Sequence, residues 1–272
     1  MDFRLTKWRV ENIDFSKVDK ESVRENRDLF YLMSTASFVE ITSDLYTKNL
    51  VSKYATQSEE LAKWLDSVWE FEELQHGRAL KAYINSVWSD FDWEAAYRAF
   101  FEEYSLLCTS SVLKHSAGLE MIERAVVETG TSTFYSFLSE ITNEPVLEEL
   151  AQNIKIDEVS HYKVFKDYFE EFNKSEQNSK WEIFKTVIER IKEMENDDTY
   201  IAFKHIYRVK EGKEFEEEAF STYNKNINSL MDKHYPYKMG AKMILQLFDL
   251  SEGSEKIILP VMVYSAKKFL FR

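Results

Sequence analysis

Apolar residues recur every three to four positions along most of the 272-residue chain, which is the period of amphipathic helices. Ser58 is suited to cap one of these helices, and Pro145 is suited to the first turn of another. With 6 Gly and 3 Pro, the chain has too few turn residues for the all-β class. The pattern predicts helices over 27–54, 58–88, 93–104, 110–142, 145–172, 181–195, 198–210, 214–233, 236–249 and 252–270.

This order of elements predicts an all-α fold. Four long helices come first, and about a hundred residues of shorter helices follow them. We therefore expect a four-helix bundle with additional C-terminal helices. Residues 1–272 are expected to form a single domain, with the bundle core over 20–172 and the appended helices over 173–272.

Carboxylate and imidazole side chains interrupt the apolar stripes of the four long helices. Glu73 and His76 are the only polar members of a stripe that runs from Ala62 to Val87. A second Glu-x-x-His pair lies within the apolar stripe of the helix predicted over 145–172, and single glutamates lie within those of the other two long helices. The interrupting residues are Glu40, Glu73, His76, Glu123, Glu158 and His161.

A metal site explains these buried charges. One Glu-x-x-His pair alone would more simply be a hydrogen-bonded pair, because ligation needs further ligands. Four buried carboxylates without metal, however, would repel one another strongly. The spacings from Glu40 to Glu73 and from Glu123 to Glu158 suit two antiparallel hairpins, and four Glu with two His form the pattern of ferritin-like di-iron bundles. We predict that all six residues bind two iron ions, or an Mn/Fe pair.

Further acidic and histidine residues have less specific patterns. Glu72 and Asp157 each lie four residues before a predicted ligand histidine, so they could accept a hydrogen bond from its imidazole. Ordinary exposed acids are the alternative. The other histidines, which lack a Glu-x-x-His partner on an apolar stripe, are expected to be ordinary surface or core residues: His115, His205 and His234.

Charge and cysteine content narrow the function classes. The net charge of −13 argues against nucleic-acid binding, which needs a basic surface. The single Cys108 excludes an intramolecular disulfide and any CxxC-type metal site, so electrons would have to come from another protein. No apolar run reaches the length of a membrane span, and the first residues do not resemble a signal peptide, so we expect a cytoplasmic protein.

At the motif residues, the chain resembles the soluble acyl-acyl-carrier-protein desaturases. WEFEELQHGRAL (69–80) resembles their W-x-x-E-E-x-x-H-G-x-x-L helix, and IERA (122–125) their Glu-Arg-Ala motif. DEVSH (157–161) is similar to their Asp-Glu-x-x-His, and NEPVL (143–147) to the lead-in of the mycobacterial branch. The resemblance covers about residues 30–172.

The resemblance implies a di-iron oxidase that uses O2 and two external electrons to introduce a cis double bond into an acyl chain. The acyl chain would be carried on acyl carrier protein, and ferredoxin or a flavoprotein would supply the electrons. No catalytic residue beyond the metal ligands is implied. The family also implies a homodimer. Lysines and arginines that could bind an acidic carrier protein, or could be ordinary solvated surface, are Lys204, Arg208, Lys210, Lys213, Lys267, Lys268 and Arg272.

Departures from the family leave other functions open. Val126 stands where plant members have a threonine one turn after the third ligand. This favours, as the alternative, a di-iron or Mn/Fe oxygenase that hydroxylates or N-oxidises another small molecule. A radical-generating ribonucleotide reductase subunit is disfavoured, because Leu80 stands where that family has tyrosine. Metal storage or a non-catalytic helical role is a third alternative, which the long C-terminal part disfavours.

Overall fold

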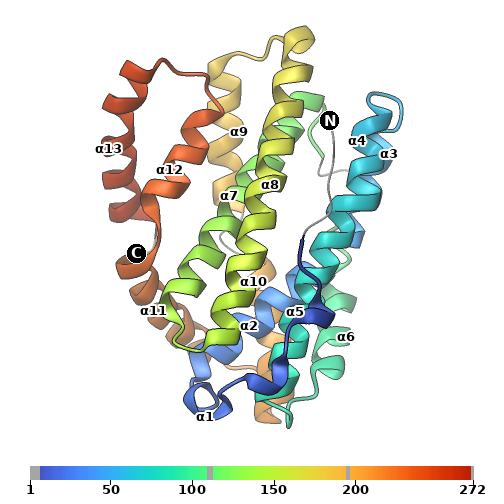
Figure 1. Ribbon diagram of the computed structural model, residues 1–272, viewed down its shortest axis with the longest axis vertical. Coiled ribbons are helices and arrows are strands. Elements are labelled where there is room, and N and C mark those ends of the chain that lie inside the picture. The colour runs from blue at the N-terminus through green and yellow to red at the C-terminus, as the bar shows by residue number, and fades with distance from the viewer. Residues whose placement is uncertain (1–6, 109–112, 194–196, 271–272) are drawn as a thin grey trace. The chain divides into compact units, whose positions relative to one another are not determined.

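A computed structural model describes residues 7–108, 113–193 and 197–270, and all regular elements within them are helical (Figure 1). In chain order the elements are η1 (Val10–Asn12), η2 (Phe15–Lys17), α1 (Lys20–Val23), α2 (Arg27–Ile41), α3 (Asp44–Tyr54), α4 (Glu59–Trp64), η3 (Leu65–Trp69), α5 (Glu70–Val87), α6 (Trp93–Tyr104), α7 (Ala117–Ile141), α8 (Pro145–Glu176), α9 (Lys180–Glu193), α10 (Asp197–Glu211), α11 (Glu217–His234), α12 (Tyr237–Gln246) and α13 (Glu252–Phe269). The predicted all-α class is therefore confirmed.

The predicted helices agree with these bounds within a few residues at most ends. Ser58 caps α4 by accepting a hydrogen bond from the Leu61 amide, as predicted. Glu144 caps α8 through the amides of Val146 and Leu147. The predicted range 110–142 begins partly outside the described residues, and α7 begins at Ala117. Among the described helices, none combines the length and apolar character that crossing a membrane requires.

The chain divides into two compact units that interleave along the sequence. Unit 1 comprises residues 1–112, 143–150 and 196–224, and unit 2 comprises residues 113–142, 151–195 and 225–272. Helices α8 and α11 therefore contribute residues to both units. Each unit combines segments from before and after residue 172, so neither corresponds to the predicted core or to the predicted appended part. The single-domain organisation stays a prediction.

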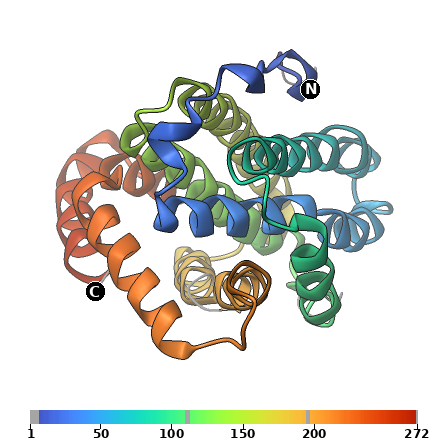
Figure 2. The ribbon, with the colours of Figure 1, turned by 90° about the horizontal axis from the view of Figure 1, so that it is seen from below.

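Unit 1 is built around α2, which contacts α5 and α10 (Figure 2). The indole of Trp93, at the start of α6, donates a hydrogen bond to the Ser37 hydroxyl on α2 at 3.0 Å. Arg27 at the other end of α2 forms an ion pair with Glu211 on α10 at 2.9 Å. The α2 residue Phe38 is fully buried against aromatic residues of α6. One of the predicted appended helices, α10, is therefore part of the packing around α2.

Two helices of unit 1 depart from uninterrupted α geometry near predicted ligands. The sequence predicts one helix over 27–54, but the structure breaks it at Thr42 and Ser43, two residues after Glu40 in the last turn of α2. The Thr42 hydroxyl donates to the Phe38 carbonyl at 2.5 Å. The second predicted helix runs from α4 to α5 through the π-helical turn η3. Such turns are frequent at functional sites.

In unit 2, hydrogen bonds fix the register of the antiparallel pair α7 and α8. Gln152 donates to Ser139 near the connection between the helices, and Thr131 donates to Glu158 near the middle. At the far end, the Glu176 carboxylate accepts bonds from the first amides of α7. These contacts place Thr131 level with Glu158. This register decides which acidic residues of α7 can reach the Glu-x-x-His pair of α8.

The remaining helices of unit 2 pack on this pair. Helix α9 contacts α7, and α12 contacts both α7 and α13. The Tyr162 hydroxyl on α8 donates to the Met243 carbonyl of α12 at 2.5 Å. Thr133 on α7 shares a hydrogen bond with Tyr235, just before α12, at 2.7 Å. The C-terminal helices of this unit are thus joined to α7 and α8 by buried hydrogen bonds.

Candidate metal centre

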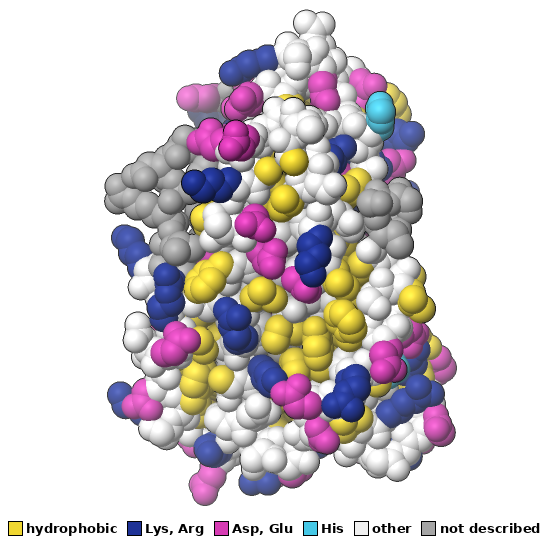
Figure 3. All heavy atoms as spheres, turned by 90° about the vertical axis from the view of Figure 1, so that its right-hand side faces the viewer, with side chains coloured by type: hydrophobic (Ala, Val, Ile, Leu, Met, Phe, Trp, Pro, Cys, Tyr) yellow, Lys and Arg dark blue, Asp and Glu magenta, His cyan; other side chains and the backbone are white. Residues whose placement is uncertain are grey.

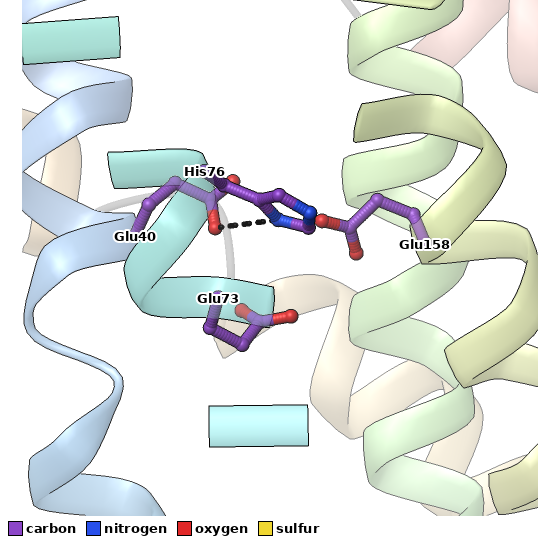
Figure 4. Close-up of side chains that lie close together, drawn as sticks. All are labelled: Glu40, Glu73, His76 and Glu158. Carbon is purple, nitrogen blue, oxygen red and sulfur yellow. Dashed lines mark ion pairs between the residues drawn. The ribbon is translucent and has the colours of Figure 1, made fainter. Parts of the chain in front are cut away.

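Unit 1 brings together three of the predicted ligands, Glu40, Glu73 and His76, called triad 1 below. Glu40 comes from α2 and the other two from α5 (Figure 4). Their ligand atoms lie within 4.8 Å of one another, and all three side chains are buried. The Nδ1 atom of His76 lies 3.7 Å from Oε2 of Glu40. The predicted pairing of a single Glu with a Glu-x-x-His pair is therefore present in this unit.

The close approach of α2 and α5 depends on Gly77. A Cβ atom built on this residue would lie 2.6 Å from the backbone nitrogen of Ile41. A separation this short is not tolerated, so only glycine permits the observed distance between the two backbones. Ile41 directly follows Glu40, and Gly77 directly follows His76. The close packing of α2 against α5 thus explains why glycine follows His76 in the α5 motif.

The segment before η1 lies against the α5 side of triad 1. The Trp8 ring is parallel to the His76 imidazole, with an interplanar angle of 5° and a centroid distance of 6.1 Å. Gln75 donates to the Trp8 carbonyl at 3.4 Å, and the Arg9 guanidinium lies 5.1 Å from the centroid of the Phe71 ring. These contacts cover His76, which has no exposed surface.

Unit 2 assembles a second triad of the same composition, Glu128, Glu158 and His161, called triad 2 below. Glu128 comes from α7 and the other two from α8. The Nδ1 atom of His161 lies 3.6 Å from Oε2 of Glu128 and 3.8 Å from Oε2 of Glu158. The ligand atoms again lie within 4.8 Å of one another, and all three side chains are buried. The predicted pair Glu158 and His161 is thus joined by Glu128, which the sequence analysis did not select.

The structure does not bring the predicted ligand Glu123 into triad 2. Thr131 is level with Glu158, so Glu123, eight residues earlier, lies about 12 Å further along α7 at 1.5 Å per residue. Glu128 lies three residues before Thr131 and is level with His161, three residues after Glu158. The correction from Glu123 to Glu128 therefore follows from the register of the two helices.

Glu123 is buried but instead takes part in a network of charges that extends to partly exposed residues. Its Oε1 atom lies 3.1 Å from Nζ of Lys114, which also lies 3.4 Å from Glu189 on α9. One turn away, Arg124 pairs with Glu120 at 3.2 Å. Burial, and then the Glu120 carboxylate, raise the pKa of Glu123. The nearby cationic side chains are sufficient to explain why a glutamate is buried at this position.

The distances within the triads fit metal ligation better than direct hydrogen bonding. The separations between histidine Nδ1 and glutamate Oε2 exceed the normal limit of a hydrogen bond. Two ligand atoms bound to one ion at about 2.1 Å lie roughly 3–4 Å apart, which matches these separations. Carboxylate and imidazole are also common ligands of first-row metals. The chain therefore contains buried carboxylate and histidine groups able to bind two metal ions, one at each triad.

Several other predicted residues can be placed. Glu72 and Asp157 are both buried, so they are not the exposed acids of the alternative interpretation. His205 lies 2.8 Å from Glu103, and His234 lies 3.2 Å from Glu140, and neither belongs to a group of potential ligands among the described residues. Val126 is buried on α7.

The candidate basic residues of α10 and the loop after it are paired with carboxylates. Their partners are Glu103 for Lys204, Glu214 for Arg208, Asp90 for Lys210 and Glu216 for Lys213. The face drawn in Figure 3 likewise shows Lys and Arg interspersed with Asp and Glu. Lys267 lies against the Tyr237 ring, and Arg272 lies outside the described residues. The α10 residues thus do not form a set of unpaired cations.

Comparisons with known proteins show similarity at the level of structure. No protein-family model matches the chain, and no curated protein matches it. Solved structures of R2-like ligand-binding oxidase variants with an aerobically reconstituted Mn/Fe cofactor do match. Two of these variants give a TM-score of 0.53 at 15% sequence identity and cover 96% of this chain and 88% of theirs. A third variant gives a TM-score of 0.50 at the same identity and coverage.

These matches extend over both units rather than over the four long helices alone. The sequence identity is too low to transfer an activity or ligand residues. The all-helical architecture and the coverage support the predicted fold, and the matching structures are oxidases rather than desaturases. The chain therefore has a ferritin-like helical fold.

Proposed function

We propose that the protein is an O2-dependent oxidase in which triads 1 and 2 each bind one metal ion. The two ions would be iron with iron or iron with manganese, and they would take part in the oxidation of a small organic molecule. The observation that carries the proposal is the occurrence, once in each unit, of a buried Glu next to a Glu-x-x-His pair. The proposed ligand set is Glu40, Glu73, His76, Glu128, Glu158 and His161.

The charge of the triads supports two divalent ions. Each triad offers two carboxylates and one neutral imidazole, which together balance one divalent cation. Without a cation, two carboxylates buried side by side would repel each other. The names of the structures of similar fold include an Mn/Fe cofactor, and these structures match 96% of this chain.

The protein would contribute position and environment to this chemistry. When bound, two iron ions, or one iron and one manganese ion, would supply the electrons that reduce O2. Glu40 and Glu128 link each Glu-x-x-His pair to its neighbouring helix, so each ion would be held between two rigid elements. Burial of the ligands excludes bulk water, and we propose that Glu72 and Asp157, which are also buried, accept hydrogen bonds that orient the imidazoles.

Metal content and O2 consumption test the proposal. Wild-type protein would be loaded anaerobically with Fe(II), or with Fe(II) and Mn(II), and then exposed to O2. We expect about two metal ions per chain and consumption of O2 by the loaded protein. Binding of metal without consumption of O2 would contradict the oxidase, and failure to bind metal would overturn the proposal.

The mass of the product distinguishes oxygen addition from desaturation. The loaded protein would be reduced and supplied with O2 and a panel of small organic acids, small amines and acylated carrier protein. Hydroxylation or N-oxidation adds one oxygen atom to the substrate, whereas desaturation removes two hydrogen atoms. We expect oxygen addition to a small molecule. Loss of two hydrogens from acylated carrier protein alone would instead support the desaturase alternative.

Acyl-acyl-carrier-protein desaturation remains a second candidate because of the motifs on α5 and α8. The same motif comparison assigns a ligand role to Glu123, which lies beside Lys114, and the cations of α10 are paired with neighbouring carboxylates. We therefore rank this candidate below oxidation of another small molecule. A ferredoxin or flavoprotein donor and a homodimer are proposed on the same family resemblance, and the cytoplasmic location expected from the sequence stays a proposal. Equilibrium sedimentation tests the dimer, and reduction rates with each donor test the electron source.

A further inference from the structure

Triad 2 receives a hydrogen bond from a side chain that the motif analysis did not select. The Oγ1 atom of Thr131 on α7 donates to Oε2 of Glu158 on α8 at 2.7 Å. The same hydroxyl lies at 3.4 Å and 3.3 Å from the carbonyls of Val127 and Glu128. One hydroxyl has one hydrogen, so the short contact to the carboxylate is its main donation. Glu158 itself has no exposed surface.

This bond distinguishes Thr131 from Thr129 and Ser132, two buried residues of α7 whose hydroxyls donate to backbone carbonyls of their own helix. Thr129 donates to the Ala125 carbonyl at 2.8 Å, and Ser132 donates to the Thr129 carbonyl at 3.2 Å. Hydroxyls on helices commonly form such backbone bonds, which satisfy the hydroxyl without a ligand. Thr131 instead reaches across to the neighbouring helix. The register of α7 against α8 brings the Thr131 hydroxyl within reach of Glu158.

A donor on one carboxylate oxygen changes how that carboxylate can bind a metal. A hydrogen bond to a charged acceptor is stronger than one between neutral groups, so it restricts the rotation of the carboxylate. It also occupies one lone pair of Oε2, the oxygen that lies 3.8 Å from Nδ1 of His161. Partners of metal ligands of this kind typically change metal affinity by about 10–100-fold when removed.

We propose that Thr131 is a positioning residue that fixes the Glu158 carboxylate and thereby sets the metal affinity of triad 2. This inference rests on the proposed function, because it takes triad 2 as a metal site. It goes further by assigning a role to a residue outside both Glu-x-x-His motifs. It also predicts that the two triads bind metal with separately adjustable affinities.

The test compares Thr131→Val, which removes the hydroxyl at nearly constant shape, with Thr131→Ser, which keeps it. Thr129→Val is the matched control, since it removes a buried hydroxyl of the same helix that bonds only to a backbone carbonyl. Each protein would be titrated anaerobically with Mn(II) and with Co(II). The readouts would be the two dissociation constants and the visible spectrum of bound Co(II), with thermal unfolding measured beside them.

We expect Thr131→Val to weaken one of the two sites by about 10–100-fold and to change its Co(II) spectrum. Thr131→Ser and Thr129→Val should bind as the wild type does. Equal affinities and spectra for Thr131→Val and wild type would overturn the inference while leaving the proposed function intact. Equal weakening by Thr131→Ser and Thr131→Val would also overturn it, since shape rather than the hydroxyl would then be responsible. Failure of the wild type to bind either metal would overturn both proposals.

Discussion

Triads 1 and 2 have the same composition and nearly the same geometry, but their surroundings differ. The contact between histidine Nδ1 and the glutamate of the neighbouring helix measures 3.7 Å in triad 1 and 3.6 Å in triad 2. Triad 1 is supported by close packing, with Gly77 against Ile41 and the Trp8 ring over His76. Triad 2 is supported by polar contacts, notably that of Thr131 with Glu158.

The difference shows that one arrangement of ligands can be held in two physical ways. Close packing fixes the distance between two backbones, and any added atom disturbs it. A hydrogen bond fixes the direction of a side chain, and it can be removed at constant shape. Substitutions that change the size of a side chain should therefore disturb triad 1, whereas substitutions that remove a polar group at constant shape should disturb triad 2. The following predictions test this contrast.

The largest effect is expected from removing either histidine. His76→Gln and His161→Gln each delete an imidazole ligand from one triad and leave the other unchanged. We expect each variant to lose one of the two metal ions. The metal affinity of the altered triad should fall by more than the factor of about 10–100 that is typical when a residue hydrogen-bonded to a ligand is removed. Metal analysis after dialysis would show about one ion per chain in each variant. Loss of both ions in both variants would contradict separately supported triads.

A smaller but sizeable effect is expected from Gly77→Ala. Its Cβ would lie 2.6 Å from the Ile41 nitrogen, so α2 and α5 must separate, at a cost of about 1–3 kcal/mol. The separation would also move Glu40 relative to His76 and weaken metal binding at triad 1. Urea unfolding and metal titration would measure the two effects.

Gly253→Ala is the matched control for Gly77→Ala. Gly253 lies on α13, and its added Cβ would have no neighbour within 4 Å. Alanine favours helix by about 0.5–1 kcal/mol over glycine, so we expect this variant to be slightly stabilised and to bind metal normally. Equal destabilisation by the two variants would contradict the role assigned to close packing at Gly77.

The smallest effect is expected from Glu176→Gln, which concerns the end of the α7 and α8 pair. Burial raises the pKa of Glu176, but hydrogen bonds from Ser116, Asn178 and the amides of Gly118 and Ala117 lower it below its usual value of 4.5. A carboxyl with a lowered folded pKa stabilises the protein above its unfolded pKa and loses that contribution as pH falls. Because the side chain is exposed, we expect a loss of about 0.5–1 kcal/mol at neutral pH.

The pH dependence distinguishes this effect from a general loss of packing. Urea unfolding of the metal-free wild type and of Glu176→Gln would be compared at neutral pH and well below pH 4.5. The difference between the two proteins should shrink as the carboxyl becomes protonated. A difference that stays constant across this range would show that the charge of Glu176 does not stabilise the start of α7.

Much of the fold could be predicted from periodicity and end signals. The predicted range 93–104 coincides with α6, where Asp92 caps the first turn. The break after α2 was missed because Thr42 and Ser43 are compatible with a helix and carry no Gly or Pro signal. The π-helical turn η3 was also missed, since it leaves the apolar stripe of the α4 to α5 segment continuous.

The error at triad 2 arose because α7 is buried around most of its circumference. Glu120, Glu123 and Glu128 are all buried, so an apolar stripe cannot choose among them. Counting outward from the turn at Asn143 and Glu144 would have placed Glu158 level with residue 129 or 130, next to Glu128. The same counting from the turn before Ser58 places Glu73 level with Glu40, so the sequence alone predicts that these two residues lie close together.

The most direct test of the ligand assignment compares Glu128→Gln with Glu123→Gln. Both residues lie on α7, and both substitutions keep the shape of the side chain while removing its charge. The raised pKa of Glu123 means that its buried charge is already disfavoured, so glutamine should be tolerated there. After loading with Fe(II) or Mn(II), we predict two metal ions per chain for Glu123→Gln and one for Glu128→Gln. The opposite pattern would show that Glu123 is the ligand and would contradict the assignment of triad 2.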